Sequence, residues 1–404
     1  MEQYLSIRDI DLQGKKVLVR VDFNVPMDEE GNIRDDARIQ AAIPTIRYIL
    51  DQGASLILMS HHGRPKGKKN LKNSLQPCAQ RLQEILGSPV IFAADCVGSK
   101  TKQLAENLQV GAILLLENLR FHHAEEKPES DLNFAKELAS LGEVYVNDAF
   151  GSAHRAHSSI VPITSYFPGH SVAGLLMEKE IRHLSPLVKN PERPFFALIG
   201  GAKVSSKIGV LKSLVKHADA LIIGGGMAFT FLKVLGYEIG DSLFEEEFLD
   251  EAKEVITLCK SENTELILPR DLVIANTFSN EADTRTIEIE EGIPRTWQGL
   301  DIGPKSIEIF SYSLKKAKTV LWNGPMGVFE FPQFAKGTFA ITKELAQSSA
   351  QTIVGGGDSV AAIQATGFHD SFDHISTGGG ASLEFIEFGN LPGIEALSKQ
   401  PSFN

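Results

Sequence analysis

Arginines and other polar side chains follow the apolar runs in the first half of the chain. Four of five such runs lead directly into polar segments, which read DFN (22–24), HHGRP (61–65), ENLRFH (117–122) and DAFGSAHRAH (148–157). Three of these segments carry an arginine, and Arg38 lies near the start of the helix expected after the first segment. A guanidinium offers a permanent charge and a planar fork of donors, which suits phosphate and carboxylate groups. A single arginine is more often a solvated surface residue, but this repeated placement after strands favours an anion site.

The histidines of these segments are weaker indicators of function. His122 and His123 fit surface positions equally well, and His157 fits a structural hydrogen-bonding role. A zinc site formed by His61, His154 and His157 is an alternative, but the neighbouring arginines would repel a metal ion.

Glycine-rich segments occupy the corresponding positions in the second half. They read GGAKVSSK (200–207), GGG (224–226), GGGDS (355–359) and GGGAS (378–382). Backbone N–H groups at a helix start bind anions, and Lys203 and Lys207 add positive charge. Asp358 could hold Mg²⁺ beside phosphates, because that ion prefers few carboxylates and keeps its waters. One glycine triplet is commonly just a turn, but four such junctions predict a cradle for nucleotide phosphates.

Short apolar runs and amphipathic segments alternate along the chain and must position these residues. The expected strands are 16–21, 55–60, 90–94, 112–117 and 143–148, then 195–200, 220–225, 265–269, 319–324 and 351–356. The runs are nearly continuous, as in strands that are covered on both faces. Segment 37–53 is a typical helix between them, with Gly53 as its stop and Pro44 indicating a kink or a later start. This order predicts an α/β fold of parallel, doubly wound sheets, whose ligands bind beyond the carboxyl ends of the strands.

Length and composition set the broad class. A chain of 404 residues exceeds one ordinary core, so two domains are expected, with segment 172–190 as a stiff connecting helix and 277–302 as an irregular or antiparallel excursion. Cys78, Cys96 and Cys259 are too far apart in sequence for a disulfide framework, which fits a reducing compartment. A net charge of −11 argues against a general nucleic-acid binder. The sequence has no apolar segment typical of a signal peptide or a membrane span, so a cytoplasmic location is expected.

Several strings resemble the motifs of the phosphoglycerate kinase family, in the order of that family. They are RVDFNVP, SHHGRP, ENLRFH, NDAFGSAHRAHSS, GGAKVSSKI, GGGMAFTFL, WNGPMGVFE, GGGDS and STGGGASLEF. Together they cover nearly the whole chain and form a highly specific set. The resemblance implies two Rossmann-like doubly wound domains that face a cleft. Residues 1–171 with the tail 389–404 would bind phosphoglycerate, 172–190 would form the interdomain helix, and 191–388 would bind the nucleotide.

The resemblance also implies the reaction and its participants. A phosphoryl group would move reversibly from 1,3-bisphosphoglycerate to MgADP, giving 3-phosphoglycerate and MgATP, as in glycolysis and gluconeogenesis. The enzyme would be a hinge-bending, monomeric phosphotransferase with a carboxyl group as acceptor. Mg²⁺ is the implied cofactor, and neither nucleic acid nor membrane is an expected partner.

The family's site residues carry over to matching positions of this sequence. The carboxyl end of the glycerate would contact Asp22, Asn24 and Arg38, and its 3-phosphate would contact His61, Arg64, Arg120 and Arg155. The implied catalytic residues are Arg38, Lys203, Gly379 and Gly380. The implied nucleotide residues are Gly201, Lys203, Lys207, Gly225, Gly226, Gly299, Leu300, Asn323, Pro325, Glu330, Gly356, Gly357, Asp358 and Ser359, with Asp358 also binding the metal.

Two positions depart from the family pattern. His62 stands where leucine is usual, and we expect a local change in packing rather than lost binding. Ser206 stands where many members have aspartate, and no role is assigned to it.

Phosphoryl transfer between an acyl phosphate and ADP explains why no acid–base pair is needed. The attacking oxygen and the leaving carboxylate are both anions at neutral pH, so no proton has to move. Catalysis then rests on positioning and on neutralising the charge of the transferring group. We therefore expect Arg38 and Lys203 to meet the phosphoryl group when the domains close.

The sequence disfavours two other classes of protein. A nicotinamide-dependent dehydrogenase is disfavoured because no GxGxxG motif follows a strand with an acidic residue about twenty positions later. A binding protein that only senses nucleotide or phosphosugar is disfavoured by the full set of reactive-site residues. GxxxxGK[ST], HRD, DFG and GxSxG motifs are also absent from the sequence, which excludes the usual P-loop, protein-kinase and α/β-hydrolase sites.

Overall fold

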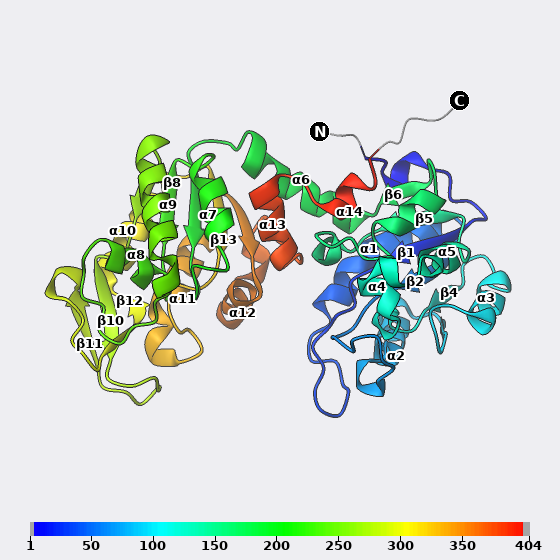
Figure 1. Cartoon of the computed structure of the whole chain (residues 1–404), viewed down its shortest axis with the longest axis horizontal. Coiled ribbons are helices and arrows are strands. Elements are labelled where there is room, and N and C mark those ends of the chain that lie inside the picture. The colour runs from blue at the N-terminus through cyan, green and yellow to red at the C-terminus, as the bar shows by residue number, and fades with distance from the viewer. Residues whose placement is uncertain (1–3, 399–404) are drawn as a thin grey trace. The chain divides into compact units, whose positions relative to one another are not determined.

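The chain divides into two compact units. The structure is a computed structural model that describes residues 4–398. Unit 1 comprises residues 1–181 and 390–404, and unit 2 comprises residues 182–389 (Figure 1). Residues 399–404 of the predicted tail, like residues 1–3, lie outside the described residues.

Unit 1 is built on a six-stranded parallel sheet in the order β3-β4-β2-β1-β5-β6. The strands are β1 (Lys16–Arg20), β2 (Ser55–Met59), β3 (Val90–Phe92), β4 (Ile113–Leu115), β5 (Val144–Asn147) and β6 (Ser171–Ala173). The helices between and after them are α1 (Ala37–Asp51), α2 (Gln76–Leu86), α3 (Ser99–Glu106), α4 (His123–Glu126), α5 (Asn133–Ala139) and α14 (Pro392–Glu395). Central strands are buried on both faces, which is why they read as continuous apolar runs.

The returning C-terminal segment belongs to unit 1. The red α14 lies beside this unit in Figure 1, and the Gly393 N–H donates to the Ala153 carbonyl at 2.8 Å. An added Cβ at Gly393 would come within 3.0 Å of the Ala153 backbone, so a glycine is needed at this close approach.

Unit 2 repeats the architecture around the parallel sheet β15-β14-β13-β7-β8-β9. Its strands are β7 (Phe195–Ile199), β8 (Ala220–Ile223), β9 (Glu265–Ile267), β13 (Thr319–Asn323), β14 (Gln351–Gly355) and β15 (His374–Ile375). Its helices are α7 (Ile208–Val215), α8 (Ala228–Val234), α9 (Leu249–Ser261), α10 (Pro304–Leu314), α11 (Lys336–Ala346), α12 (Gly357–Thr366) and α13 (Gly380–Phe388). The predicted α/β class with parallel sheets in both halves is confirmed.

A separate antiparallel sheet in unit 2 has the order β11-β10-β12. Its strands are β10 (Asp271–Ala275), β11 (Thr284–Glu288) and β12 (Gln298–Ile302). The antiparallel excursion predicted for 277–302 is therefore confirmed, although it begins earlier, at Asp271.

The segment that joins the units differs from its prediction at its start. Helix α6 (Leu175–Lys189) begins three residues later than the predicted helix 172–190, because Val172 and Ala173 pair with β5 as strand β6. Helix α1 contains Pro44 in its interior, so the later start considered for that segment is wrong. None of the described helices is long and apolar enough to cross a membrane.

Candidate phosphate-binding sites

The strand order predicts a ligand crevice at one point of each parallel sheet. In unit 1 the chain leaves neighbouring strands β1 and β5 toward opposite edges, and in unit 2 it does so from β7 and β13. Loops at the carboxyl ends of two such strands diverge and leave room for a ligand between them. The predicted residues after β1 and β5, and after β7 and β13, lie at these two points.

The loop after β1 is tied to the loop after β2. Arg38 of α1 donates from Nη1 to both carboxylate oxygens of Asp22 at 3.0 Å. The Asn24 side-chain oxygen accepts the N–H of Gly63 at 2.8 Å. The Asn24 N–H in turn donates to Asp22 at 3.1 Å, so the three predicted residues for the glycerate carboxyl end form one connected group.

Arg120 joins this group from the segment after β4. Its side chain is 9% exposed and donates from Nη1 to the Gly63 carbonyl at 2.8 Å. Its Nε lies 3.2 Å from a carboxylate oxygen of Glu126. Arg64 and Arg155 are exposed, and the described residues form no ion pair with them. The structure thus brings Arg120 into the group and leaves two arginines open to solvent.

Two fully buried charged residues, Arg20 and Glu125, lie behind His61 and were not predicted as site residues. Arg20 is the last residue of β1, and one of its nitrogens lies 3.1 Å from Nδ1 of His61. Glu125 accepts hydrogen bonds from the Ser159 N–H at 3.0 Å and from the Ser159 hydroxyl at 2.6 Å. An arginine at the end of an apolar run was the available signal, because a buried guanidinium must be paired.

The positive charges of this site act on its histidines. Burial, followed by the charges of Arg20 and Arg120, lowers the pKa of His61 well below its usual range. The same causes lower the pKa of His157 to about 3. Both imidazoles are therefore neutral near pH 7, and the arginines alone supply the positive charge that an anion would meet.

Three glycine-rich loops of unit 2 touch one another through their backbones. The Gly201 N–H donates to the Pro325 carbonyl at 2.9 Å, and the Gly225 N–H donates to the Met326 carbonyl at 3.1 Å. An added Cβ at Gly225 would lie 2.6 Å from the Gly201 nitrogen. Gly201 and Gly225 also have φ values of +102° and +66°. Only glycine permits this backbone packing, which brings the loops after β7, β8 and β13 together.

Lys207 lies within this packing. Its Nζ donates to the carbonyls of Gly200 at 2.6 Å and Asn323 at 3.2 Å. Burial lowers the pKa of Lys207 to about 8, and the nearby Asp358 carboxylate opposes that shift. Asn323 is 2% exposed, and its side-chain nitrogen has no hydrogen-bond acceptor among the described residues. A buried, unpaired donor beside a lysine fits a phosphate oxygen.

The start of α12 supplies the predicted metal residue. Gly356 precedes the helix with φ +93°, and Asp358 is exposed in its first turn. Ser359 is buried, and its hydroxyl accepts the Gly324 N–H at 2.6 Å. Ser359 thus holds the loop after β13, whereas Asp358 remains open to solvent. An exposed carboxylate next to a lysine and free helix N–H groups fits a Mg²⁺–phosphate group.

Other predicted nucleotide residues occupy different environments. Lys203 and Glu330 are exposed, and Gly299 and Leu300 lie buried on β12. A Cβ at Gly299 would meet the Phe229 ring at 2.2 Å, which explains the glycine by packing.

The predicted catalytic glycines lie at the start of α13 and face open space. Gly379 has φ +56° and caps the helix, which begins at Gly380. An added Cβ at either position would meet no described atom within 4 Å.

The two residues that depart from the family pattern, His62 and Ser206, both make hydrogen bonds. A ring nitrogen of the buried His62 lies 3.1 Å from the Val25 carbonyl, which leucine could not bind. The Ser206 hydroxyl donates to the Lys203 carbonyl at 3.0 Å. His62 therefore makes a polar contact to the loop after β1, and the packing change expected there stays a prediction.

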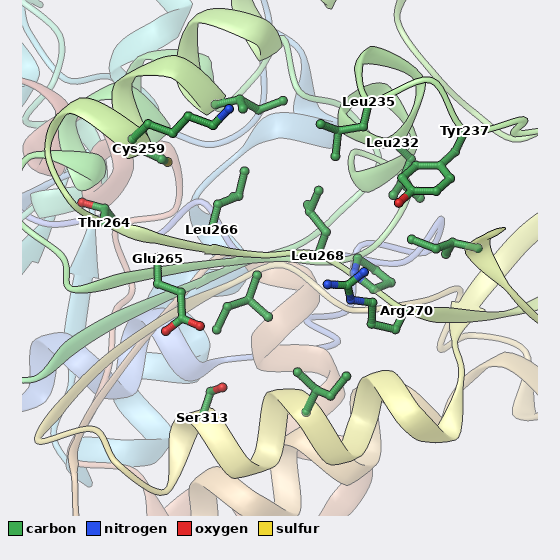
Figure 2. A pocket seen from close by; sticks show the side chains of 16 residues that line it. Leu232, Leu235, Tyr237, Cys259, Thr264, Glu265, Leu266, Leu268, Arg270 and Ser313 are labelled. Carbon is green, nitrogen blue, oxygen red and sulfur yellow. The ribbon is translucent and has the colours of Figure 1, made fainter.

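A pocket of about 600 Å³ lies along the edge strand β9, and it contains none of the predicted residues. Figure 2 shows Leu232, Tyr237, Leu266, Leu268 and Arg270 among the side chains that line it. Within residues 4–398, one group of metal-ligand side chains lies close together, and it is Asp95, Cys96 and His122. In that group His122 already pairs with Asp95 at 2.7 Å, and burial raises the pKa of the Cys96 thiol well above its usual range. The histidines of the alternative zinc site do not form such a group.

Comparisons with known proteins identify relatives that match this chain over almost its whole length. A family model described as phosphoglycerate kinase matches residues 7–388. A phosphoglycerate kinase of Koribacter versatilis is 54% identical, covering 98% of this chain and 99% of its own. One from Prosthecochloris aestuarii is 52% identical, covering 98% and 100%. The solved phosphoglycerate kinase structure from Coxiella burnetii superposes with a TM-score of 0.87 at 38% identity, over 98% of this chain and 99% of that one. The chain therefore belongs to the phosphoglycerate kinase family, a family of phosphotransferase enzymes.

Proposed function

We propose that this chain transfers a phosphoryl group directly and in line from 1,3-bisphosphoglycerate to MgADP, and that it catalyses the reverse reaction with 3-phosphoglycerate and MgATP. The observation that supports the proposal is the presence of two different groups of residues suited to anions in one chain. An arginine group lies at the switch point of one sheet, and a lysine–glycine cradle lies at that of the other. Family membership supports the identity of both substrates.

Unit 1 is assigned to the phosphoglycerate. Asp22, Asn24 and Arg38 would bind its carboxyl end, since the Asp22 carboxylate already accepts hydrogen bonds from the Arg38 side chain and from the backbone N–H of Asn24. His61 and Arg120 would bind the 3-phosphate, joined by the exposed Arg64 and Arg155. Arginine forks and a neutral imidazole N–H are all donors, as a phosphate requires.

Unit 2 is assigned to the nucleotide. Lys207 and the unpaired side-chain nitrogen of Asn323 would contact phosphate oxygens, with N–H groups at the starts of α12 and α13. The exposed Lys203 would contact the phosphoryl group in transfer. Asp358 would hold Mg²⁺, which neutralises phosphate charge when bound.

Catalysis by these residues needs no proton transfer. The nucleophile is an ADP phosphate oxygen, the bond broken joins phosphorus to the acyl oxygen, and the leaving group is a carboxylate. Arg38 and Lys203 would therefore stabilise charge rather than move protons. Closure of the two units would bring both residues to the phosphoryl group and exclude water.

The function is tested by an assay that couples 3-phosphoglycerate and MgATP consumption to a nicotinamide signal. We expect turnover that requires both substrates and the metal. Binding of each substrate without turnover would favour a sensing protein and contradict the proposal. Small-angle scattering tests closure separately, and an unchanged profile with both substrates bound would contradict that step.

A further inference from the structure

The buried pair of Arg20 and Glu125 has no part in the reaction as proposed above. Both side chains are 0% exposed, and their closest charged atoms are 4.0 Å apart. Burying two charges costs free energy that a distant pairing repays poorly, so stability alone is a weak reason for this arrangement.

Arg20 directs each of its three nitrogens at a different acceptor. Nε donates to the Ser159 hydroxyl at 2.9 Å, and Nη1 donates to the Val21 carbonyl. Nη2 lies 3.1 Å from Nδ1 of His61. The Ser159 hydroxyl in turn donates a hydrogen bond to Glu125 at 2.6 Å, so the acceptor of Nε is itself held in place and orients the guanidinium. A lysine could not reach these acceptors with one ammonium group.

This contact determines which nitrogen of His61 carries the proton. A guanidinium has donors only, so Nδ1 must accept the hydrogen bond. A neutral imidazole has one donor and one acceptor, which places the remaining proton on Nε2. An imidazolium at this position would set its own N–H against that of Arg20. Nε2 makes no hydrogen bond to any described residue, so it is available to a ligand.

We propose that Arg20 is a positioning residue that holds His61 as the neutral Nε2–H tautomer and so presents that N–H as a donor to the substrate phosphate. The identity of the phosphate rests on the proposed function, whereas the tautomer does not. Groups from four segments face the ring: Arg20 of β1, Arg38 of α1, Arg120 after β4 and His157 after β5. They disfavour the imidazolium, so His61 contributes a donor without adding a charge that varies with pH.

Nitrogen-15 NMR of the ligand-free protein tests the tautomer directly. The signals of His61 are identified by comparison with His61→Gln. We expect an unprotonated Nδ1 and a protonated Nε2 from pH 8 down to at least pH 5.5. An Nδ1–H tautomer or an imidazolium at neutral pH would overturn the proposal. Adding 3-phosphoglycerate should then shift the Nε2 signal.

A charge-balanced double variant, Arg20→Met with Glu125→Gln, tests the consequence for substrate binding. We expect both tautomers of His61 and a KM for 3-phosphoglycerate raised about tenfold or more, with kcat and the KM for MgATP changed little. Between pH 5.5 and 8 that KM should also depend on pH more strongly than the wild-type KM, which already varies with ionisation of the substrate phosphate. Tyr145→Phe is the matched control, because it removes the hydrogen bond to the Ser159 carbonyl at 2.8 Å but no contact of Arg20.

The outcomes separate this inference from the proposed function. A folded double variant that keeps the Nε2–H tautomer and an unchanged KM would overturn the role of Arg20. A locked tautomer in a wild-type protein whose Nε2 signal ignores 3-phosphoglycerate would contradict the phosphate assignment of His61 alone. Absence of turnover in the coupled assay would contradict the proposed function while leaving the tautomer intact.

Discussion

Hydrogen bonds among the side chains of unit 1 orient them before any ligand binds. Asp22 orients Arg38, and the Gly63 carbonyl and N–H orient Arg120 and Asn24 respectively. Groups fixed in this way lose little freedom on binding, so their interactions favour the transition state more effectively. Small changes in donor geometry should therefore have large kinetic effects.

Arg38→Lys should be nearly as harmful as Arg38→Ala. Asp22 already engages Nη1 of Arg38, and the other nitrogens of the fork make no hydrogen bond to a described residue. The single ammonium group of a lysine would pair with Asp22, which would leave the phosphoryl group without a donor at this position. We expect a loss of about 3–4 kcal/mol in transition-state stabilisation for either variant, measured as kcat in the coupled assay.

The control for this prediction is Arg81→Lys. Arg81 also forms an ion pair on unit 1, with Asp36 at 2.9 Å, but it lies outside the candidate site. Its replacement should change kcat less than twofold. A kcat loss below tenfold for Arg38→Lys would contradict the role assigned to that fork.

Residues placed after strands were predictable, and residues that support them were not. Asp22, Asn24 and His61 follow apolar runs, so strand position alone marked them as candidates. Arg20 ends an apolar run, which marks it as a candidate buried charge, but its role and that of Glu125 could not be predicted, because both depend on Ser159, which is distant from both in sequence. Pairings of this kind arise from the fold and leave no local pattern.

At the level of elements, the loops of unit 2 depend on glycine for close backbone contact. The sequence predicted the glycine-rich junctions but not which of them touch. Strands β6 and β15 were also missed, because three and two residues are too few to show a periodic pattern. The start of α6 was placed too early for the same reason, since the residues of β6 were included in the helix.

Gly225→Ala should weaken ADP binding by about tenfold or more. The added methyl group would lie 2.6 Å from the Gly201 nitrogen and 2.7 Å from its carbonyl oxygen, so the loops after β7 and β8 must separate. Overpacking of this kind costs about 1–3 kcal/mol, and here it would distort the loops proposed to bind the nucleotide phosphates. Isothermal titration calorimetry with MgADP measures the effect.

Gly236→Ala separates loop packing from backbone strain. Gly236 has φ +92°, but a Cβ there would meet nothing within 4 Å. This variant should lose about 1–2 kcal/mol of stability from the left-handed backbone and keep its ADP affinity. Equal affinity losses in both variants would contradict the proposed role of the loop contact.

At the scale of the whole molecule, each unit contains a buried aspartate with structural hydrogen bonds. Asp148 of unit 1 accepts the Leu176 N–H at 2.9 Å and the Met177 N–H at 3.2 Å, at the start of α6. Asp301 of unit 2 accepts the Gly337 N–H at 2.8 Å. Burial raises the pKa of each carboxyl to about 7, because it disfavours the charged form. The folded chain therefore holds protons that the unfolded chain releases above about pH 4.

These acids and the buried histidines should affect stability with opposite signs. A carboxyl whose pKa is raised by folding contributes to the unfolding free energy. That contribution is fully present below about pH 4 and is lost as the pH rises to about 7. The pKa of His157, lowered to about 3, acts in reverse: the unfolded imidazole takes up a proton below about pH 6.5, so the fold loses stability as the pH falls. The unfolding free energy of the wild-type chain as a function of pH is the sum of both contributions, so neither can be obtained from the wild type alone.

Asp148→Asn should reveal the contribution of one carboxyl to the pH dependence of the unfolding free energy. The asparagine oxygen can accept the same two N–H groups but carries no charge at any pH. Relative to wild type, the variant should gain about 2 kcal/mol in unfolding free energy between pH 5 and pH 7.5 and little more above that, measured by denaturant titration. Asp131→Asn is the matched control, since Asp131 is exposed and also accepts a backbone N–H at a helix start, that of Asn133 at 2.9 Å. A variant-to-wild-type difference that stays constant with pH would show that Asp148 is already ionised in the folded chain, and that burial at the start of α6 does not govern its protonation.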